Sequence, residues 1–307
     1  PARSASPLRW FVACWLPAPL LSAPTRLERH SPVFPPAMES LRADWEMAGR
    51  VEVDAGKPRL SLHPGQLFQS GFMWSAHPVP SNDFEMTATV EIQSEQDFYG
   101  SGGLQDGLAF WYVEEDGMGA RAHFEATAKE RRKRARRLEK KKTPKPSAVG
   151  DLYGYREQYR GLGVFIYLEG SPMLNALAAG PASEGFEQEK VSLSDVLEAP
   201  GGLGLYEPIW GEGDLRGKEF KLTVRVEPRR ATISVTDCGR MTVEGNFKPG
   251  GYIGFTTVSS IRPEFVDFGY APPGSATVHL SGLQVTSFSE VPPERAAAAA
   301  AEPPQPA

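Results

Sequence analysis

Cysteine is nearly absent from the 307-residue chain, which contains only Cys14 and Cys238. If Cys14 lies in a leader that is removed, Cys238 is alone and no internal disulfide can form. The five histidines are scattered, and they show neither the two-histidine spacing of a metal site nor a Ser/His/Asp or Cys/His set. No stretch provides the roughly 20 apolar residues that a membrane-spanning helix needs. These absences argue against a disulfide scaffold, a histidine-based metal site and a membrane span.

Turn-forming residues and a potential core are both present. Gly 31 and Pro 28 together make up about a fifth of the chain, which favours many turns over long helices. Hydrophobic residues account for 40% and aromatic residues for 10%, enough for a substantial core. A chain of this length can form one large all-β domain or two ordinary ones.

The two ends differ from the middle in composition. Residues 8–23, "LRWFVACWLPAPLLSA", carry one basic residue, an apolar run and a small-residue end, which resembles a secretory signal sequence, although a disordered apolar tail is the alternative. We therefore interpret residues 1–30 as leader and linker, residues 31–290 as one domain, and residues 291–307 as a low-complexity Ala/Pro linker. This predicts the lumen of the secretory pathway, with any membrane anchor outside the chain.

The central region has the pattern of short strands. "FEMTATVEI" (84–92) alternates apolar and polar residues, as a strand with one solvated face does. "GLAFWYV" (107–113) and "GLGVFIYL" (161–168) are apolar on both faces, as expected for strands between two layers. Further strands are predicted in a hairpin (220–227 and 231–237) and at 58–64, 250–258 and 276–288. The spacing predicts an all-β sandwich or jelly roll.

One basic segment interrupts the strands. Residues 129–145 contain eleven Lys/Arg against Glu130 and Glu139, a charge of +9, so the rest of a chain of net charge −5 carries −14. Residues 119–142 have helix-forming composition, but like charges four residues apart weaken an isolated helix. We expect an inserted, solvated arm at 118–148, helical or disordered. The 129–145 segment can contact an anionic surface, whereas nucleic acid is not favoured because no aromatic residues are interleaved for base stacking.

The order of motifs resembles a known family. "DGLAFWYV" (106–113) followed by "GDLYGYREQYRGLGVFIYL" (150–168) is similar to the L-type (legume-like) lectin domain of early-secretory cargo receptors. "PRLSLHPGQLFQSGFMWSAHPV" (58–79) fits the second and third strands of that family, and the hairpin at 220–237 fits a later one. The resemblance covers about residues 30–290.

The resemblance implies a concanavalin-like jelly-roll β-sandwich that binds high-mannose glycans or glycoprotein cargo at a calcium-organised site. Asp106, followed by Gly107, matches the aspartate that bonds sugar hydroxyls. The calcium loop of the family, Asp-x-aromatic-x-Asn, maps to Tyr167, Glu169 and Ser171, which differ at every position. Since calcium prefers six to eight oxygen ligands with carboxylates prominent, we expect calcium and ordinary mannose binding to be weak.

Other positions of the family pattern also differ. The glycan-contacting serine of the family maps to Phe68, and its glycine-containing sugar loop maps to Ser260–Arg262 without a glycine. Cys238 matches the second cysteine of a pair found in the animal receptors, while "EGDLRG" (212–217) offers no partner.

Several residues have simpler interpretations. Asp106 can be a strand-entry turn residue, since Asp-Gly is a common turn dipeptide. The aromatic and acidic residues considered for sugar stacking or a rearranged calcium site are more often core residues and solvated charges; they are Trp74, Phe110, Trp111, Tyr112, Glu169, Glu184, Glu187, Glu189 and Asp195.

Three functions follow from the scaffold. The leading hypothesis is a non-enzymatic lectin-like domain acting in cargo transport or quality control between endoplasmic reticulum and Golgi. The alternative is a protein-interaction module on the same sandwich that has lost sugar and calcium. A glycoside hydrolase would need two facing carboxylates; Glu91 and Glu95 have a suitable spacing, but "EIQSEQD" (91–97) runs out of the strand into a loop.

Overall fold

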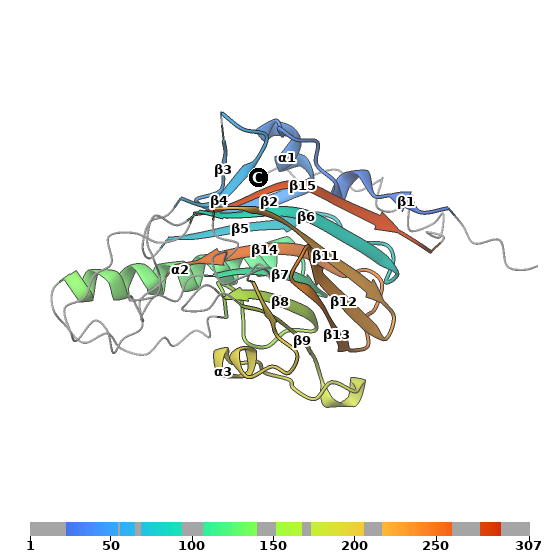
Figure 1. Cartoon of the computed structure of the whole chain (residues 1–307). Helices are drawn as coiled ribbons and strands as arrows, with labels where there is room; N and C mark the ends of the chain where they lie inside the picture. The colour runs from blue at the N-terminus through green and yellow to red at the C-terminus, as the bar shows by residue number, and fades with distance from the viewer. Residues whose placement is uncertain are drawn as a thin grey trace, which may run out of the picture.

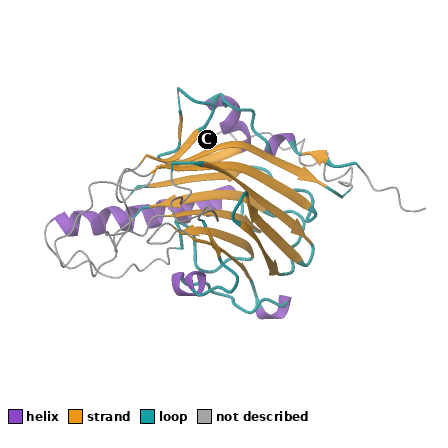
Figure 2. Ribbon diagram, viewed as in Figure 1, coloured by secondary structure: helices purple, strands orange, loops and turns teal. Residues whose placement is uncertain are grey.

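Two antiparallel β-sheets pack face to face (Figure 1, Figure 2). The computed structural model describes residues 23–54, 56–64, 69–93, 107–139, 152–167, 173–205, 217–259 and 277–289. The predicted all-β sandwich is confirmed, and the strands predicted from hydrophobic alternation appear within one or two residues of their expected ends.

The first sheet has eight strands. Its order is β13 (Gly239–Glu244), β12 (Arg230–Val235), β11 (Glu219–Glu227), β6 (Phe84–Gln93), β15 (Thr277–Ser287), β4 (Leu60–Pro64) and β3 (Glu52–Val53), with β1 (Thr25–Arg26) also paired to β15. Along β6 buried and half-buried residues alternate over all ten positions, so one face meets the core and the other faces outward.

The second sheet has seven strands. Its order is β10 (Leu203–Gly204), β9 (Met173–Ala179), β8 (Gly161–Tyr167), β7 (Gly107–Val113), β14 (Tyr252–Val258), β5 (Ser70–Ser75) and β2 (Trp45–Gly49). All seven residues of β7 are buried. This explains the uninterrupted apolar sequence of the strand, because both faces of β7 are covered.

The main core lies between the two sheets. Leu108, Phe110 and Tyr112 of β7 point into it together with the inward residues of the eight-stranded sheet. The Tyr112 ring meets Phe84 edge-on at 4.8 Å, and Phe110 meets Phe255 at 5.5 Å. The Tyr112–Phe84 contact therefore joins the two sheets, whereas the Phe110–Phe255 contact joins β7 and β14 within the seven-stranded sheet.

A second core covers the outer face of the seven-stranded sheet. Phe72, Trp74, Ala109, Trp111 and Phe165 point away from the first core. They are covered by helix α2 (Gly117–Glu139), by the turn at 152–155 and by the short helix α3 (Leu193–Leu197). The seven-stranded sheet is thus the middle layer of the molecule.

Helix α2 confirms the helical alternative for the inserted arm and corrects the expectation that the arm is solvated on all sides. The helix begins where Asp116 Oδ1 accepts a hydrogen bond from the Gly119 backbone N–H at 2.8 Å, a usual N-terminal cap. One row of its side chains is buried, with Phe124 only 1% exposed and its ring 5.1 Å from that of Phe72. This contact was not predicted because Phe124 is the one large apolar residue in the buried row, and one residue gives no helical periodicity of apolar positions.

Residues just before the expected domain start take part in the fold. Thr25 and Arg26 of β1 pair with Thr286 and Ser287 of β15, and the 3₁₀ helix η1 (Glu28–His30) follows. His30 is buried, and its Nε2 lies 2.9 Å from the His77 carbonyl oxygen. The folded domain therefore includes residues 25–30.

The remaining helices are short. They are α1 (Met38–Asp44), which precedes β2, the 3₁₀ helix η3 (Ala182–Glu184), and α3, which begins with a capping box between Ser192 and Asp195. Cys238 is half-buried and forms no disulfide within the described residues. Within the described residues, none of the helices has the length and apolar character to cross a bilayer.

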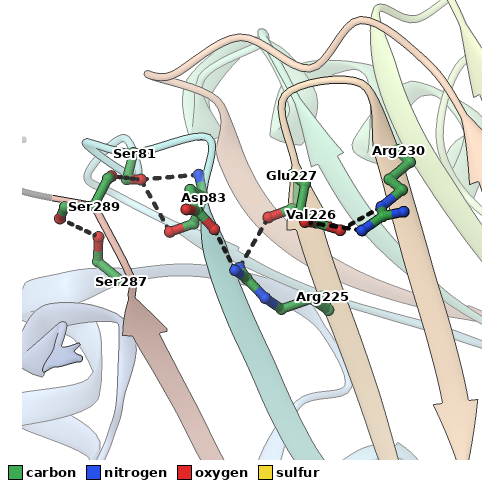
Figure 3. Close-up of polar contacts among 8 residues, drawn as sticks. All are labelled: Ser81, Asp83, Arg225, Val226, Glu227, Arg230, Ser287 and Ser289. Carbon is green, nitrogen blue, oxygen red and sulfur yellow. Dashed lines mark hydrogen bonds and ion pairs between the residues drawn. The ribbon is translucent and has the colours of Figure 1, made fainter. Parts of the chain in front are cut away.

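Polar contacts close one end of the eight-stranded sheet (Figure 3). Arg225 of β11 forms an ion pair with Asp83, which precedes β6, and its guanidinium carbon lies 4.1 Å from the centre of the Phe288 ring after β15. The Ser81 and Ser289 hydroxyls share a hydrogen bond that joins the same segments. At this end of the sheet, side chains therefore connect β11, the segment before β6 and the segment after β15.

Candidate functional site

The strand ends that adjoin the positions mapped to the sugar and calcium site meet at one end of the seven-stranded sheet. Gly107, the first residue of β7, pairs with Tyr167, the last residue of β8, and with Val258, the last residue of β14. Val258 in turn pairs with Ser70, the first residue of β5. Four neighbouring strands therefore begin or end at the same edge.

The remaining mapped residues lie within four residues of these strand ends in the sequence. Asp106 precedes β7, Glu169 and Ser171 follow β8, Phe68 precedes β5, and Ser260–Arg262 follow β14. All of these lie outside the described residues. Pairing of the strands alone places their attachment points together, although the positions are spread over nearly 200 residues of sequence.

Position 107 requires glycine because the ring of Tyr153 occupies the space where a Cβ atom would lie. Gly107 is buried, and a Cβ atom added to it would lie 2.0 Å from Tyr153 Cε1 and 2.8 Å from the Ile166 carbonyl oxygen. No side chain fits in that space. The structure thus gives Gly107 a packing role, and its candidate role in sugar binding remains a proposal.

Tyr153 belongs to a turn that the sequence analysis did not identify. Leu152 and Tyr155 exchange backbone hydrogen bonds of 2.8 and 2.9 Å, and Tyr153 between them has a left-handed φ of 50°. The Tyr153 ring lies 5.4 Å from that of Phe165, beside the first residue of β7. The outer face next to the candidate site is therefore covered. The signal for this turn is "LYGY" (152–155), in which Gly154 has a φ of 89°.

Helix α2 reaches the same end of the sheet. A Cβ added to Gly154 would lie 3.3 Å from Val258, 3.4 Å from Phe124 and 3.5 Å from the Arg131 guanidinium. Phe124 and Arg131 of α2 thus lie beside Gly154 of the 152–155 turn, as does Val258, the last residue of β14. The inserted helix is part of the surroundings of the candidate site.

The aromatic residues considered for sugar stacking are core residues. Trp74, Phe110, Trp111 and Tyr112 are all 2% exposed or less. The Trp111 indole N–H donates to Thr256 Oγ1 at 2.8 Å, and the Tyr112 hydroxyl donates to the Lys248 carbonyl at 2.6 Å. Their polar groups are used inside the protein, so none of these rings offers a free face to a sugar.

The donor set does not fit calcium well. Tyr167, the one mapped calcium position that is described, presents a phenol where the family has a carboxylate, and calcium favours carboxylate oxygens. Of the other acidic candidates, Glu184 pairs with Lys248 at 2.8 Å and Asp195 caps α3. The described residues contain no cluster of three or more potential metal ligands.

Glu91, the described member of the hydrolase pair, is bound on the other sheet. It lies in β6, where the Arg59 guanidinium and the Gln93 amide both donate to its carboxylate. Burial would raise the pKa of Glu91, but these two donors outweigh it and hold the pKa below its usual value. Glu95 lies outside the described residues. The carboxylate of Glu91 is thus held in an ion pair on the eight-stranded sheet, as a structural group is.

A polar hollow of about 540 Å³ lies at the opposite end of the seven-stranded sheet. Glu115, Tyr155 and Arg156 line it, and the Glu115 carboxylate accepts hydrogen bonds from the Tyr155 hydroxyl and the Arg156 guanidinium. Burial, with the nearby Glu115 carboxylate, raises the pKa of Tyr155 well above its usual value. These groups bind one another and hold the turn against the sheet.

Comparison with known sequences finds a family match for part of the chain. The model of the legume-like lectin family matches residues 25–171. No curated protein matches the chain in sequence. The matched segment runs from β1 to the end of β8, and it includes the "DGLAFWYV" and "GLGVFIYL" strands on which the resemblance rests.

Solved structures share the fold at low identity. The exoplasmic/lumenal domain of VIP36, bound to Ca²⁺ and Man3GlcNAc, is 13% identical over 87% of this chain and 93% of that chain, with a TM-score of 0.55. The legume lectin-like domain from Entamoeba histolytica is 16% identical over 86% and 99%, with a TM-score of 0.51. The carbohydrate recognition domain of Emp47p is 13% identical over 86% and 98%, with a TM-score of 0.53. These similarities establish the sandwich architecture.

Proposed function

Residues 25–171 match the model of the legume-like lectin family, and from this premise we propose that the protein is a non-enzymatic carbohydrate-binding domain for glycoprotein cargo. The observation that carries the proposal is the edge of the seven-stranded sheet, where Gly107, Tyr167, Val258 and Ser70 are paired neighbours. Asp106 is attached to this edge and would supply the carboxylate that accepts hydrogen bonds from sugar hydroxyls.

Structural neighbours support this class of ligand. The VIP36 domain was crystallised with Man3GlcNAc, with Man2 and with mannose. By analogy, a mannose-containing glycan on a cargo glycoprotein is the proposed ligand, and the secretory lumen is the proposed location. Catalysis is not part of the proposal, since Glu91 is ion-paired on the opposite sheet.

The ligand set differs from that of a calcium-organised mannose site. Tyr167 and Ser171 replace the carboxylate and the amide of the family's calcium loop, Glu169 places a carboxylate where the family has an aromatic residue, and Phe68 replaces a serine hydroxyl. The proposed site therefore depends on Asp106 and the backbone at Gly107 more than on a metal.

The proposal is tested by the substitution Asp106→Ala on a glycan array. We expect the full chain to bind at least one glycan and the variant to lose that signal, because the replaced carboxylate is the proposed acceptor for sugar hydroxyls. Glu52→Ala, which removes an exposed carboxylate on β3 of the other sheet, is the matched control and should bind normally. A surviving signal in a folded Asp106→Ala protein would remove Asp106 from the site. A blank array for the unmodified chain would favour the protein-interaction module.

Calcium should stabilise the protein only slightly. A ligand that binds the native state raises stability by RT ln(1 + [L]/Kd), so weak binding gives a small effect. We expect about 1 mM Ca²⁺ to change Tm by less than about 2 °C, since a Kd near 1 mM corresponds to only about 0.4 kcal/mol. Differential scanning calorimetry with and without EDTA measures this. A rise of several degrees that EDTA abolishes would show that the loop after β8 does bind calcium.

A further inference from the structure

Helix α2 has two rows of side chains with opposite surroundings. The row that faces the sheet is buried and consists of Ala120, Phe124, Thr127, Ala128 and Arg131. The row on the opposite side of the C-terminal half is exposed and consists of Lys129, Arg132, Lys133 and Arg136, with Arg137 beside it. The exposed row follows the i, i+3, i+4, i+7 spacing that brings residues to one face of a helix.

The positive charge along this row is largely uncompensated. Near the start of α2, Arg121 is paired with Glu46 and with Glu125, each at 3.0 Å. In the second half, Lys133 pairs with Glu130. Within the described residues, Lys129, Arg132, Arg136 and Arg137 form no ion pair. Exposed cations of one sign along a rigid rod create a local positive potential on a protein whose remainder is acidic.

The helix carries this charge past the end of the sheet. Figure 1 shows α2 extending beyond the ends of the neighbouring strands. Contacts of Phe124 and Arg131 near Gly154 and Val258 place this half of α2 beside the edge that holds the candidate sugar site. The helix rises 1.5 Å per residue, so the cations from Lys129 to Arg136 are spread over about 10 Å.

We propose that the exposed row of α2 binds a linear sulfated polysaccharide. A linear polyanion matches a linear row of cations, and release of its counterions would drive binding. A membrane surface fits less well, because the row contains no apolar side chain to insert and the exposed Met118 lies at the other end of the helix. Nucleic acid fits less well because the row has no aromatic side chain for base stacking.

The test uses the full chain and a fluorescent heparin octasaccharide as the probe. The variant replaces Lys129, Arg132, Lys133 and Arg136 with Gln, which keeps helix propensity while removing four charges. A matched control replaces four exposed cations on the other sheet and its loops with Gln; they are Lys57, Lys221, Arg229 and Arg240. Circular dichroism verifies that both variants remain folded. Anisotropy titrations at several salt concentrations give Kd and its salt dependence.

We expect the α2 variant to bind at least about tenfold more weakly at 50 mM salt, and the slope of log Kd against log salt to fall by about three to four, as for four lost contacts on a rodlike polyanion. The control should bind within about twofold of the unmodified chain. No binding by the unmodified chain, or equal losses in both variants, would overturn the proposal. So would equal or tighter binding to a DNA duplex of the same length or to phosphatidylserine vesicles. Self-association at low salt that the α2 variant abolishes would instead identify a second copy as the partner.

Failure of this proposal and failure of the lectin proposal can be distinguished. Asp106→Ala should leave heparin binding unchanged, and the α2 variant should leave any neutral-glycan signal on the array unchanged. If Asp106→Ala alone abolished heparin binding, the polyanion would occupy the sheet edge and the α2 proposal would be wrong.

Discussion

Replacing Phe124 with Ala should lower the free energy of unfolding by about 3–5 kcal/mol, the range seen when a fully buried Phe is truncated. Phe124 is 1% exposed and is the large apolar side chain that fixes α2 to the outer face, where its ring lies 5.1 Å from Phe72. The rest of the buried row is small or polar. Little else is therefore available to hold the helix once the ring is removed.

The loss should be concentrated in α2. An isolated helix carrying many like charges is weak, so we expect the helical signal at 222 nm to fall and backbone amides in 117–131 to exchange faster. Urea titration measures the overall change, and hydrogen exchange locates it. The control is Met118→Ala, which truncates a side chain on the same helix that is 75% exposed and should change stability by less than about 0.5 kcal/mol. If Phe124→Ala unfolds like the unmodified protein, α2 is held by contacts other than this ring.

Acidification should destabilise the protein between about pH 6.5 and pH 4 through His30. Burial is the main cause that lowers the pKa of His30 to about 4, assisted by the nearby His77 and Arg29, while the hydrogen bond to the His77 carbonyl acts in the opposite direction. In the unfolded chain the imidazole titrates near pH 6.5. Between these two values the unfolded state binds a proton that the folded state does not bind.

The sign follows from this difference in bound protons. Stability is unaffected above about pH 6.5, falls as pH decreases toward 4, and levels off below it. A difference of about 2.5 units corresponds to roughly 3 kcal/mol at most, as an order of magnitude. Burial also lowers the pKa of His279, which acts in the same direction.

Urea titrations between pH 4 and pH 7.5 measure this dependence. His30→Gln retains an N–H donor for the His77 carbonyl but does not titrate, so its stability should depend less on pH in this range. His123→Gln, on α2, is the control and should keep the original dependence. An unchanged pH profile in His30→Gln would mean that acid sensitivity arises elsewhere.

Most of the sandwich could be predicted from local patterns. The alternation in 84–92 and the doubly apolar runs at 107–113 and 161–168 specify how each strand is buried, because side chains on a strand point alternately to its two faces. The helical alternative for the insertion at 118–148 is confirmed over 117–139, but the expectation that the helix is solvated was wrong for the row from Ala120 to Arg131 that packs on the sheet. Its basic composition is that of a solvated segment, and one phenylalanine among charged residues gives little periodic signal.

The candidate site was likewise predicted only in part from the sequence. The motif around Asp106 identified the strand that carries it, and the resemblance mapped the other positions one by one. That the adjoining strand ends at Ser70, Gly107, Tyr167 and Val258 are neighbours depends on the pairing of β5, β14, β7 and β8, whose residues are far apart in sequence.

The amino-acid sequence by itself determined that this protein is an all-β sandwich of lectin type, with an acidic body and a basic insertion, because strand periodicity and charge are properties of neighbouring residues. Only the tertiary structure decided that the first half of the insertion is a docked helix, that Tyr153 fills the space above Gly107, and that this helix lies beside the end of β14. Those features depend on contacts between segments that local sequence does not specify. They arise from packing, because whether a side chain is buried depends on which other segment lies against it.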